Sequence, residues 1–492
     1  MDWLDRLSQF WPHFAAGFDF FAALLASIHA LLNKRDSRAA TLWLGIIWLV
    51  PVLGPLLYLA LGVNRLRRRA VSLQFDKVIS QPVPENLGEP EHADAEHLKM
   101  LARVVSRVVT KPLTAGNTIQ PLVNGDEAFP AMLAAIESAK NSISFCTYIF
   151  DNDSSGRKFA AALSRAKKRG VKVRVLIDAA GSRYSFPPIT WRLLRKGIRF
   201  AKFLPTSLLT PWRVATINLR NHRKSLVIDG KIAFTGGMNI RKGNIVGVQR
   251  EDSSVEIKKR IPRNAIQDLQ FRVEGPVVAQ LQEAFANDWA FATGEILDGE
   301  LWFPELSESG RIIARVITDG PDEDFEKARW TLLAALAEAQ TSVEILTPYF
   351  VPDTALITAL NLAALRGVRV DIILPEKNNL PFVHWASRSM WWQVLERGCR
   401  IWLTPPPFDH SKLMIVDGHW VLLGSANWDA RSLRLNFELN VECYGRSFAA
   451  EMENLLQKKI AAGREIKLAD ADARSFLGKL RDAIARLFSP YL

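Results

Sequence analysis

A motif that occurs twice constrains this chain more than any other feature of its sequence. The first copy, residues 222–229, reads HRKSLVID, and the second, residues 410–417, reads HSKLMIVD. Each copy is followed by a short glycine-containing stretch that ends in asparagine, GGMN at 236–239 and GSAN at 424–427. One His-x-Lys-x4-Asp pattern specifies only three residues and would be weak evidence. Two copies, each followed by the same kind of stretch, indicate a duplicated unit in which both copies serve one function.

Each copy predicts the same local structure. In the second copy, the apolar run 413–416 predicts a buried strand, and Asp417-Gly418 is typical of a hairpin turn. Residues two apart in an extended segment share a face, so His410 and Lys412 present an imidazole and an ammonium group side by side. The first copy predicts the same arrangement.

The residue types in the motif are those that phosphodiester exchange requires. The reaction needs a nucleophile, a proton donor for the leaving alkoxide and positive charge beside the non-bridging oxygens. The motif histidines and lysines are the candidate catalytic residues, and the downstream asparagines are candidates for binding phosphate (His222, Lys224, His410, Lys412, Asn239 and Asn427). We predict no metal site, because neither histidine has another histidine or cysteine at ligand spacing, and the chemistry requires no cofactor.

Four acidic residues are candidates for supporting roles. Asp229 and Asp417 complete the catalytic motif, but they fall at the hairpin turns, so we expect their role to be mainly structural. A nucleophilic imidazole needs an acceptor that holds its other nitrogen in one tautomer. Asp268, in the strand after the first motif, and Glu438, after the second, are the better candidates for orienting the histidines. The alternative is that both are exposed acids at a strand edge.

The two motifs resemble the paired HKD motifs of the phospholipase D superfamily. The flanking segments NLRN at 218–221, TPYFVPD at 347–353 and RSLRLNFE at 431–438 are similar to those of bacterial cardiolipin synthases. One departure is visible, because the stretch 241–264 is unusually basic and lacks the acidic and aromatic pattern of that family.

This resemblance implies a fold and a reaction. The expected fold is α/β, with two phospholipase D-like halves of mixed sheet that meet around a pseudo-twofold axis. The expected reaction moves a phosphatidyl group from one phosphatidylglycerol to the glycerol head of another and releases glycerol. The resemblance also implies a phosphatidyl-histidine intermediate on His222, with His410 as the proton carrier.

Composition leaves other functions open. The net charge of +12 implies attraction to a polyanion, either nucleic acid or an anionic membrane surface. The runner-up is a phospholipase D that uses water or another alcohol as acceptor, followed by a nuclease of the same superfamily. A nuclease has no need of a bilayer anchor, so we predict no obligatory nucleic acid. Intact motifs disfavour a non-catalytic lipid-binding module. The oligomeric state is left open.

The N-terminus predicts a transmembrane hairpin. Residues 41–62 carry no charge and are long enough to span a bilayer, whereas Asp19 and His29 interrupt a weaker segment at 14–32. A signal or interfacial helix is the alternative for the first segment. Arginines at 65 and 67–69 favour a cytoplasmic catalytic part, which predicts a multi-pass protein of the bacterial inner membrane.

Five regions are predicted: the hairpin at 1–62, a polar linker at 63–115, a first phospholipase D-like half at 116–298, a second at 299–450 and an amphipathic tail at 451–492. The linker histidines His92 and His97 are expected to be exposed. The helix predicted at 476–488 either lies on the membrane or docks on the domain. Tryptophans within 382–394 either rim a lipid entrance or pack in the core. The three cysteines are expected to be buried thiols.

Overall fold

The computed structural model describes residues 2–34, 37–62, 97–205, 218–247, 264–322 and 324–489. The chain divides into two compact units, one made of Met1–Arg67 with Leu204–Leu219 and the other of the remaining residues. Several predictions lie outside the described residues, namely those on the arginines at 65–69, on His92 and its neighbours, and on most of the basic stretch at 241–264.

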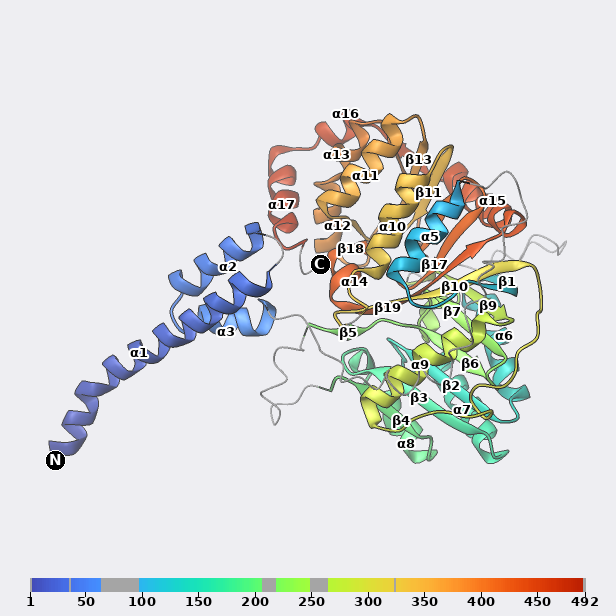
Figure 1. The fold of residues 1–492 in the computed structure, drawn as a ribbon, viewed down its shortest axis with the longest axis horizontal. Helices are drawn as coiled ribbons and strands as arrows, with labels where there is room; N and C mark the ends of the chain where they lie inside the picture. Colours follow the sequence, from blue (N-terminus) through green and yellow to red (C-terminus); the bar gives the residue numbers. More distant parts are fainter. Residues whose placement is uncertain are drawn as a thin grey trace. The chain divides into compact units, whose positions relative to one another are not determined.

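The N-terminal unit is helical (Figure 1). It consists of α1 (Asp2–Asn33), α2 (Ser37–Leu49), α3 (Leu53–Leu57) and a π-helical turn at Tyr58–Gly62. Within α1, the segment His13–Asn33 is long and apolar enough to cross a membrane. Helix α2 folds back along α1, where Trp48 Nε1 donates to Ser27 Oγ at 3.0 Å and the His29 ring meets the Tyr58 hydroxyl at 2.8 Å.

The prediction of one continuous helix over residues 41–62 is wrong. Helix α2 ends at Leu49, and the chain turns before α3 starts at Leu53. Pro51 lacks an N–H and its ring clashes with the preceding turn, so the helix stops before it, and Val52 has a positive φ of 62°. The long uninterrupted helix is instead the first one, in which Asp19 is tolerated and accepts a hydrogen bond from the Val52 N–H.

The first half of the larger unit alternates strands and helices, as the sequence predicts. Its main elements are β1 (Thr114–Val123), α6 (Asn124–Ser138), β2 (Ser142–Thr147), α7 (Ser154–Lys168), β3 (Lys172–Asp178), α8 (Ile189–Arg195), β4 (Phe200–Phe203), β6 (Ser225–Ile228), β7 (Ile232–Gly236), β9 (Leu269–Glu274) and α9 (Val277–Thr293). Two further strands, β5 (Arg220–Asn221) and β8 (Ile266–Gln267), are only two residues long.

The second half repeats this order. Its main elements are β10 (Ile312–Asp319), α10 (Lys327–Glu338), β11 (Ser342–Leu346), α11 (Thr354–Leu365), β13 (Arg369–Pro375), α12 (Pro381–Arg388), α13 (Trp391–Leu395), β14 (Arg400–Thr404), β16 (Leu413–Val416), β17 (Trp420–Gly424), β19 (Asn436–Tyr444) and α15 (Arg446–Ala462). The short strands are β12 (Phe350–Val351), β15 (Phe408–Asp409) and β18 (Trp428–Asp429), with α14 (Ala430–Arg434) after the last of them. The chain continues through β20 (Arg464–Ile466), α16 (Leu468–Asp472) and α17 (Phe476–Arg486).

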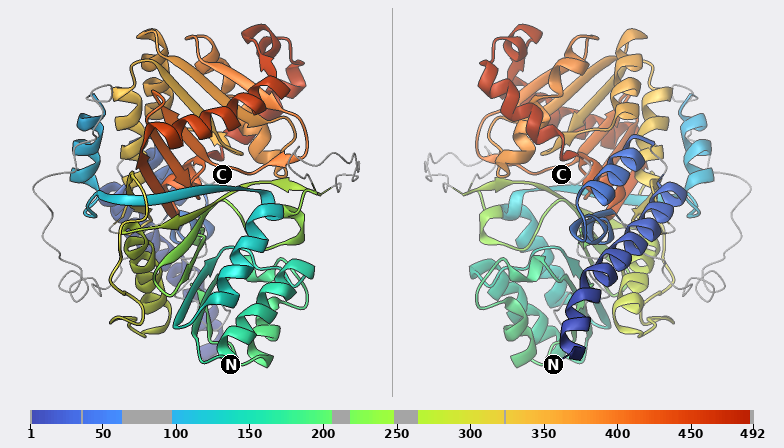
Figure 2. Two further views of the ribbon diagram at one scale, coloured as in Figure 1. Left: turned by 90° about the vertical axis from the view of Figure 1, so that its right-hand side faces the viewer. Right: turned by 90° about the vertical axis from the view of Figure 1, so that its left-hand side faces the viewer.

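The sheet joins the two halves symmetrically. The strand order is β20-β14-β13-β11-β16-β17-β19-β10-β1-β9-β7-β6-β2-β3-β4, so equivalent strands occupy equivalent places counted from the centre. The central strands β1 and β10 pair antiparallel, as a twofold relation between the halves requires. Figure 2 shows β1, in cyan, running between the orange second half and the green first half. The duplicated α/β fold with mixed sheets is therefore confirmed.

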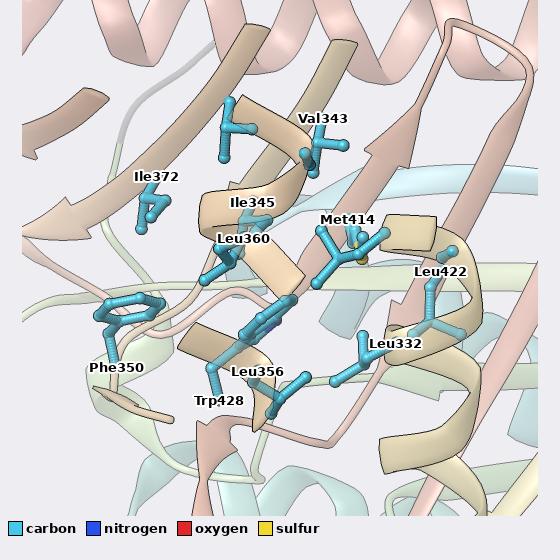
Figure 3. Packing of buried hydrophobic residues seen from close by; sticks show 14 of the residues in the cluster. Leu332, Val343, Ile345, Phe350, Leu356, Leu360, Ile372, Met414, Leu422 and Trp428 are labelled. Atoms are coloured by element: carbon cyan, nitrogen blue, oxygen red, sulfur yellow. The ribbon is translucent and has the colours of Figure 1, made fainter. Parts of the chain in front are cut away.

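Helices cover the outer faces of the sheet. In the second half, α10 and α11 pack leucines against alternate residues of β11, β13 and β16 (Figure 3). Leu332, Leu356 and Leu360 come from the helices, and they meet Ile345 and Ile372 from the strands, all of them buried. Helix α5 (Leu98–Val108) joins the same cluster through apolar residues at helical spacing.

Two predicted boundaries need correction. Helix α5 lies in the range predicted as linker, but Leu98, Leu101 and Val105 are fully buried against the second half, so residues 98–108 belong to the folded unit. Helix α15 crosses the boundary placed at 450, because its buried residues run from Phe448 to Leu456. The buried residues of α5 recur at helical spacing, but this spacing alone does not tell which surface the helix covers.

Candidate active site

The two motifs lie on hairpins at equivalent places in the sheet. Strands β6 and β7 pair antiparallel in the first half, and β16 and β17 do so in the second. The chain enters each motif through a two-residue strand that pairs with the other half. Strand β5, before His222, pairs with β19, and strand β15, before His410, pairs with β8. Each histidine is thus held by backbone from the opposite half.

The orienting acids are crossed between the halves. His222 Nδ1 lies 2.9 Å from Glu438 Oε2, and His410 Nδ1 lies 2.9 Å from Asp268 Oδ2. All four side chains are buried, so the alternative of exposed acids at a strand edge is wrong. With Nδ1–H donating to a carboxylate, Nε2 of each imidazole is the nitrogen left for chemistry. Among the described residues, each motif histidine is therefore paired with an acid from the opposite half.

The two acids differ in charge state. Burial opposes ionisation of Glu438, but His222, Lys224 and a hydrogen bond from Ser425 outweigh it, so the pKa of Glu438 is lowered. Its carboxylate accepts from Ser425 Oγ at 2.5 Å and from Asn436 Nδ2 at 3.1 Å. In contrast, burial raises the pKa of Asp268 to about 7, although Lys412 acts against the shift. At neutral pH Glu438 is therefore an anion, whereas Asp268 is partly protonated.

Both imidazoles are neutral in the free site. Burial lowers the pKa of His222 to about 4, even though Glu438 raises it. Burial, Lys412 and Lys224 lower the pKa of His410 well below its usual value. Of the two histidines, His222 is therefore the one whose positive charge is better stabilised, by the carboxylate of Glu438.

The motif lysines face the same site. Burial lowers the pKa of Lys224 to about 7 and that of Lys412 to about 8. Lys224 Nζ donates to the carbonyl oxygen of His222 at 2.6 Å, and Lys412 Nζ donates to that of His410. Because the pKa values of both lysines lie close to neutral pH, their protonation responds strongly to an incoming anion, whose charge favours the protonated forms.

The two asparagines are buried but bonded differently. Asn239 accepts the N–H of Ile149 at 3.0 Å, and its amide nitrogen has no hydrogen-bond partner within the described parts of the chain. Asn427 donates to Ser432 Oγ at 3.0 Å, and its amide oxygen has no partner there. Of the pair, Asn239 therefore has the whole amino group available for a phosphate oxygen.

The motif aspartates organise the hairpin turns. Asp229 accepts backbone N–H groups of residues 140–142, and Asp417 accepts those of residues 340–342. Burial opposes ionisation of Asp417, but these hydrogen bonds outweigh it and lower its pKa. Asp417 also meets His97 Nε2 at 2.7 Å, so the prediction that His97 is an exposed bystander is wrong.

Sequence reasoning missed a buried ion pair behind the first motif. Arg223 is fully buried. Its guanidinium group donates to Asp288 Oδ1 at 2.9 Å and to the Glu438 carbonyl oxygen at 3.0 Å. Asn221 donates to the other Asp288 oxygen at 2.9 Å. The available signal was a charged residue among the mainly apolar residues on the buried side of α9.

The second half has an ion pair of opposite polarity beside its motif. There Asp409, one residue before the motif histidine rather than one after it, pairs with Lys459 of α15 at 2.5 Å. An ion pair to the following helix thus anchors each motif, with the charges exchanged.

Aromatic rings lie against both histidines. The Tyr148 ring is 5.1 Å from that of His222, and the Tyr349 ring is 6.1 Å from that of His410, in both cases edge to face. Burial raises the pKa of each tyrosine, so both hydroxyl groups stay protonated and can only donate or accept hydrogen bonds. These rings shield the imidazoles from water.

A duplicated α/β fold with paired histidine–lysine motifs and acid-backed imidazoles defines a protein of the phospholipase D superfamily. The family model described as "Cardiolipin synthase, PLD-like domain" matches residues 132–289 and 332–460. A second model, described as "Phospholipase_D-nuclease N-terminal", matches residues 21–62. The chain belongs to the cardiolipin synthase family of phospholipase D-like proteins.

Individual relatives are similar over almost the whole chain. Cardiolipin synthase A of Pseudomonas fluorescens (strain Pf-5) is 32% identical, with 96% of this chain and 96% of that protein covered. The cardiolipin synthase of Geobacillus kaustophilus is 31% identical, with 95% and 91% covered. Among solved structures, phosphatidylserine synthase of Haemophilus influenzae matches with a TM-score of 0.61 at 15% identity, covering 80% of this chain and 100% of that one. That likeness concerns the fold.

Proposed function

We propose that this chain is a cardiolipin synthase, a phosphatidyltransferase that joins two phosphatidylglycerol molecules and releases glycerol. The observation that carries the proposal is the crossed pair of acid-backed histidines, because it provides one site with two imidazoles in different electrostatic surroundings. The near full-length similarity to relatives that carry this name supports the choice of substrate.

In the first step, Nε2 of His222 attacks the phosphorus of one phosphatidylglycerol. The bond from phosphorus to the headgroup glycerol oxygen breaks, and His410 gives that oxygen its proton. The products are free glycerol and a phosphatidyl group bonded to His222. The charge that develops on the non-bridging oxygens is stabilised by Lys224, Lys412 and the Asn239 amide.

The ionised Glu438 supports His222 as the nucleophile. Its carboxylate stabilises the positive charge that the His222 ring gains when Nε2 bonds to phosphorus. Asp268 provides less stabilisation at neutral pH, because burial raises its pKa to about 7. His410 therefore binds a proton less tightly and releases it more readily to the leaving alkoxide.

In the second step, a hydroxyl of the second phosphatidylglycerol attacks the phosphatidyl-histidine. His410 removes the proton of that hydroxyl, the bond between phosphorus and Nε2 breaks, and cardiolipin leaves with His222 restored. Asp229 and Asp417 act as positioning residues at the hairpin turns.

His410 is neutral in the free site and becomes protonated when the substrate binds. The phosphodiester anion offsets the two lysines and raises the pKa of His410. The rate then requires one neutral and one protonated imidazole, which predicts a bell-shaped dependence on pH.

The apolar N-terminal helix indicates membrane association. We extend this to a multi-pass protein of the bacterial inner membrane with a cytoplasmic active site.

Incubation of the purified chain with phosphatidylglycerol vesicles tests the reaction. Cardiolipin and glycerol should form in equal amounts, and excess glycerol should drive the reaction backwards. Phosphatidic acid as the only product would identify a hydrolase, and DNA cleavage without lipid turnover would identify a nuclease.

A trapping experiment tests the order of the histidines. With an activated phosphatidyl donor, whose leaving group needs no proton, the His410→Ala enzyme should accumulate the covalent adduct, whereas His222→Ala should not. An adduct mapped to His410 in the unmodified enzyme would reverse the assignment.

A further inference from the structure

One face of helix α17 holds it firmly on the catalytic unit. Asp482 is fully buried and accepts from Arg474 and Arg481 at 2.7 Å each, with Arg388 of α12 at 3.7 Å. Ala485, on the same face, is also fully buried. The helix therefore presents its opposite face outward in a fixed orientation.

That outward face is apolar. The exposed side chains are Phe476, Leu477, Leu480 and Ile484 on the helix, with Leu487 and Phe488 directly after it. At 100° per residue these six positions fall within an arc of roughly 120°. A continuous apolar stripe of this width on a helix that is already docked indicates a partner outside the described chain.

Two basic residues lie along one edge of the stripe. Lys479 is exposed and Arg486 is partly exposed, and neither has an ion-pair partner among the residues that the structure describes. An apolar face with cationic side chains at its edge is typical of helices that lie in the interface of an anionic bilayer. A protein partner would need no such cationic edge.

The stripe continues toward the candidate active site. The Phe488 ring packs on Phe382 of α12 at 5.4 Å, and Leu380, just before that helix, is exposed. The next residue back, Asn379, accepts the Tyr349 hydroxyl hydrogen at 2.8 Å, and Tyr349 packs on His410. Apolar surface thus extends from α17 to the residues that border the His410 side of the site.

We propose that this surface, the α17 strip, lies in the headgroup region of an anionic phospholipid bilayer and leads lipid from the membrane to the site of His410. The strip comprises the six apolar residues of α17 and its end, together with Leu380 and Phe382. The proposal rests on the proposed function, since it assumes that the substrate is a membrane lipid. An apolar helix face of this kind settles about 5–10 Å into the interface. Of the tryptophans considered as a lipid rim, Trp391 is buried and Trp392 is exposed.

A fluorescent label measures insertion directly. Cys146, Cys399 and Cys443 are buried, so one introduced cysteine takes the label selectively. In the full chain in phosphatidylglycerol–phosphatidylcholine vesicles, an environment-sensitive dye at Leu477→Cys should shift to the blue and be quenched by spin labels on the lipid chains. Detergent micelles should shield the same dye as well, because an apolar strip that enters a bilayer also enters a micelle, so quenching by spin labels on the lipid chains is the readout that reports the bilayer.

Helix α11 offers a matched control. Leu362 and Leu365 are 53% and 64% exposed, and they have the same three-residue spacing as Leu477 and Leu480, which are 74% and 46% exposed. Helix α11 ends just before the start of β13, whereas Asn379 follows the end of β13. Leu365 and Asn379 are therefore placed at opposite ends of this strand. A dye at Leu365→Cys should therefore report water in vesicles.

Paired substitutions test the role of the strip in turnover. The Leu477→Glu/Leu480→Glu enzyme should need roughly tenfold more vesicle lipid for half-maximal rate. Its rate on monomeric short-chain phosphatidylglycerol should not change, and the Leu362→Glu/Leu365→Glu enzyme should behave as wild type. Thermal unfolding should show that both variants are folded.

The outcomes separate the hypotheses. Equal dye signals at residues 477 and 365, or equal vesicle kinetics for the two double variants, would overturn the proposal. A dye at residue 477 that is shielded from water but not quenched by spin labels on the lipid chains, on protein that elutes as a dimer, would assign the strip to a second copy of the chain instead. Insertion without any cardiolipin formation would refute the proposed reaction and leave the strip as a membrane surface.

Discussion

Replacement of Glu438 by glutamine removes one negative charge and keeps the shape of the side chain. The carboxylate of Glu438 holds Nδ1 of His222 at 2.9 Å and is itself held by Ser425 and Asn436. Because Glu438 is ionised and Asp268 is partly protonated at neutral pH, we expect Glu438→Gln to cost much more activity than Asp268→Asn. The second substitution is the matched control, since each changes the acid behind one histidine.

The magnitude follows from the hydrogen bond that loses its charge. A hydrogen bond to a charged group contributes about 1.5–3 kcal/mol. Each 1.36 kcal/mol changes a rate about tenfold, so kcat should fall about 10- to 150-fold if this stabilisation develops in the transition state. For Asp268→Asn the loss should be less than about tenfold, because roughly half of the Asp268 side chains are already neutral near pH 7.

The pH profile distinguishes this role from a merely structural one. The negative charge of Glu438 raises the pKa of His222, so its loss should lower that pKa further. The neutral imidazole is the active form, and the acidic limb of kcat/KM should therefore move to lower pH, by about one to two units for the same free energy. Cardiolipin formation from phosphatidylglycerol in detergent micelles, followed by mass spectrometry, provides the rates. A Glu438→Gln enzyme within twofold of wild type, or an acidic limb that moves to higher pH, would refute the reasoning.

Three further predictions concern stability and anchoring. Arg223→Met removes the ion-pair partner of the buried Asp288, which keeps its hydrogen bond from Asn221, and should cost about 3–5 kcal/mol in urea unfolding. Adding Asp288→Leu should recover most of this loss. Asp417→Asn should lower the free energy of unfolding by about 1–3 kcal/mol at pH 7. The pKa of Asp417 is lowered in the folded state, so the difference in unfolding free energy between wild type and variant should be fully present above the unfolded-state pKa of about 4. It should shrink as the pH falls through the folded-state pKa, and thermal melts in strong acid should show no difference. The full chain should resist carbonate extraction, whereas a chain starting at Leu98 should be released by salt or carbonate; release of the full chain would exclude a spanning helix.

Much of the site could be predicted from the sequence because its residues lie in short windows. The spacing of His222 and Lys224 on a strand, the turns at Asp229 and Asp417 and the apolar runs of the hairpins obey local rules. The repeat of the motif predicted the duplicated fold and the equivalence of the two halves. Local rules also identified the types of residue that would orient the histidines.

Other features depended on context that a local pattern does not contain. The helix over residues 41–62 was predicted from hydropathy, but the backbone restriction at Pro51 ends it. Helix α5 was placed in a linker because its flanks are polar, yet four of its side chains are buried on the second half. His97 was expected to be exposed for the same reason, and it contacts Asp417 instead.

The sequence alone determined the candidate catalytic groups of this protein: two histidines, two lysines and two acids on a duplicated α/β unit. Only the tertiary structure decided which acid serves which histidine. Glu438 and His222 are 216 residues apart, and Asp268 and His410 are 142 apart. Their pairing follows from β5 joining β19 and β15 joining β8, contacts between halves that are set by the packing of the whole sheet. The same packing excludes water from both acids, and the different neighbours of each leave Glu438 ionised and Asp268 about half protonated near pH 7.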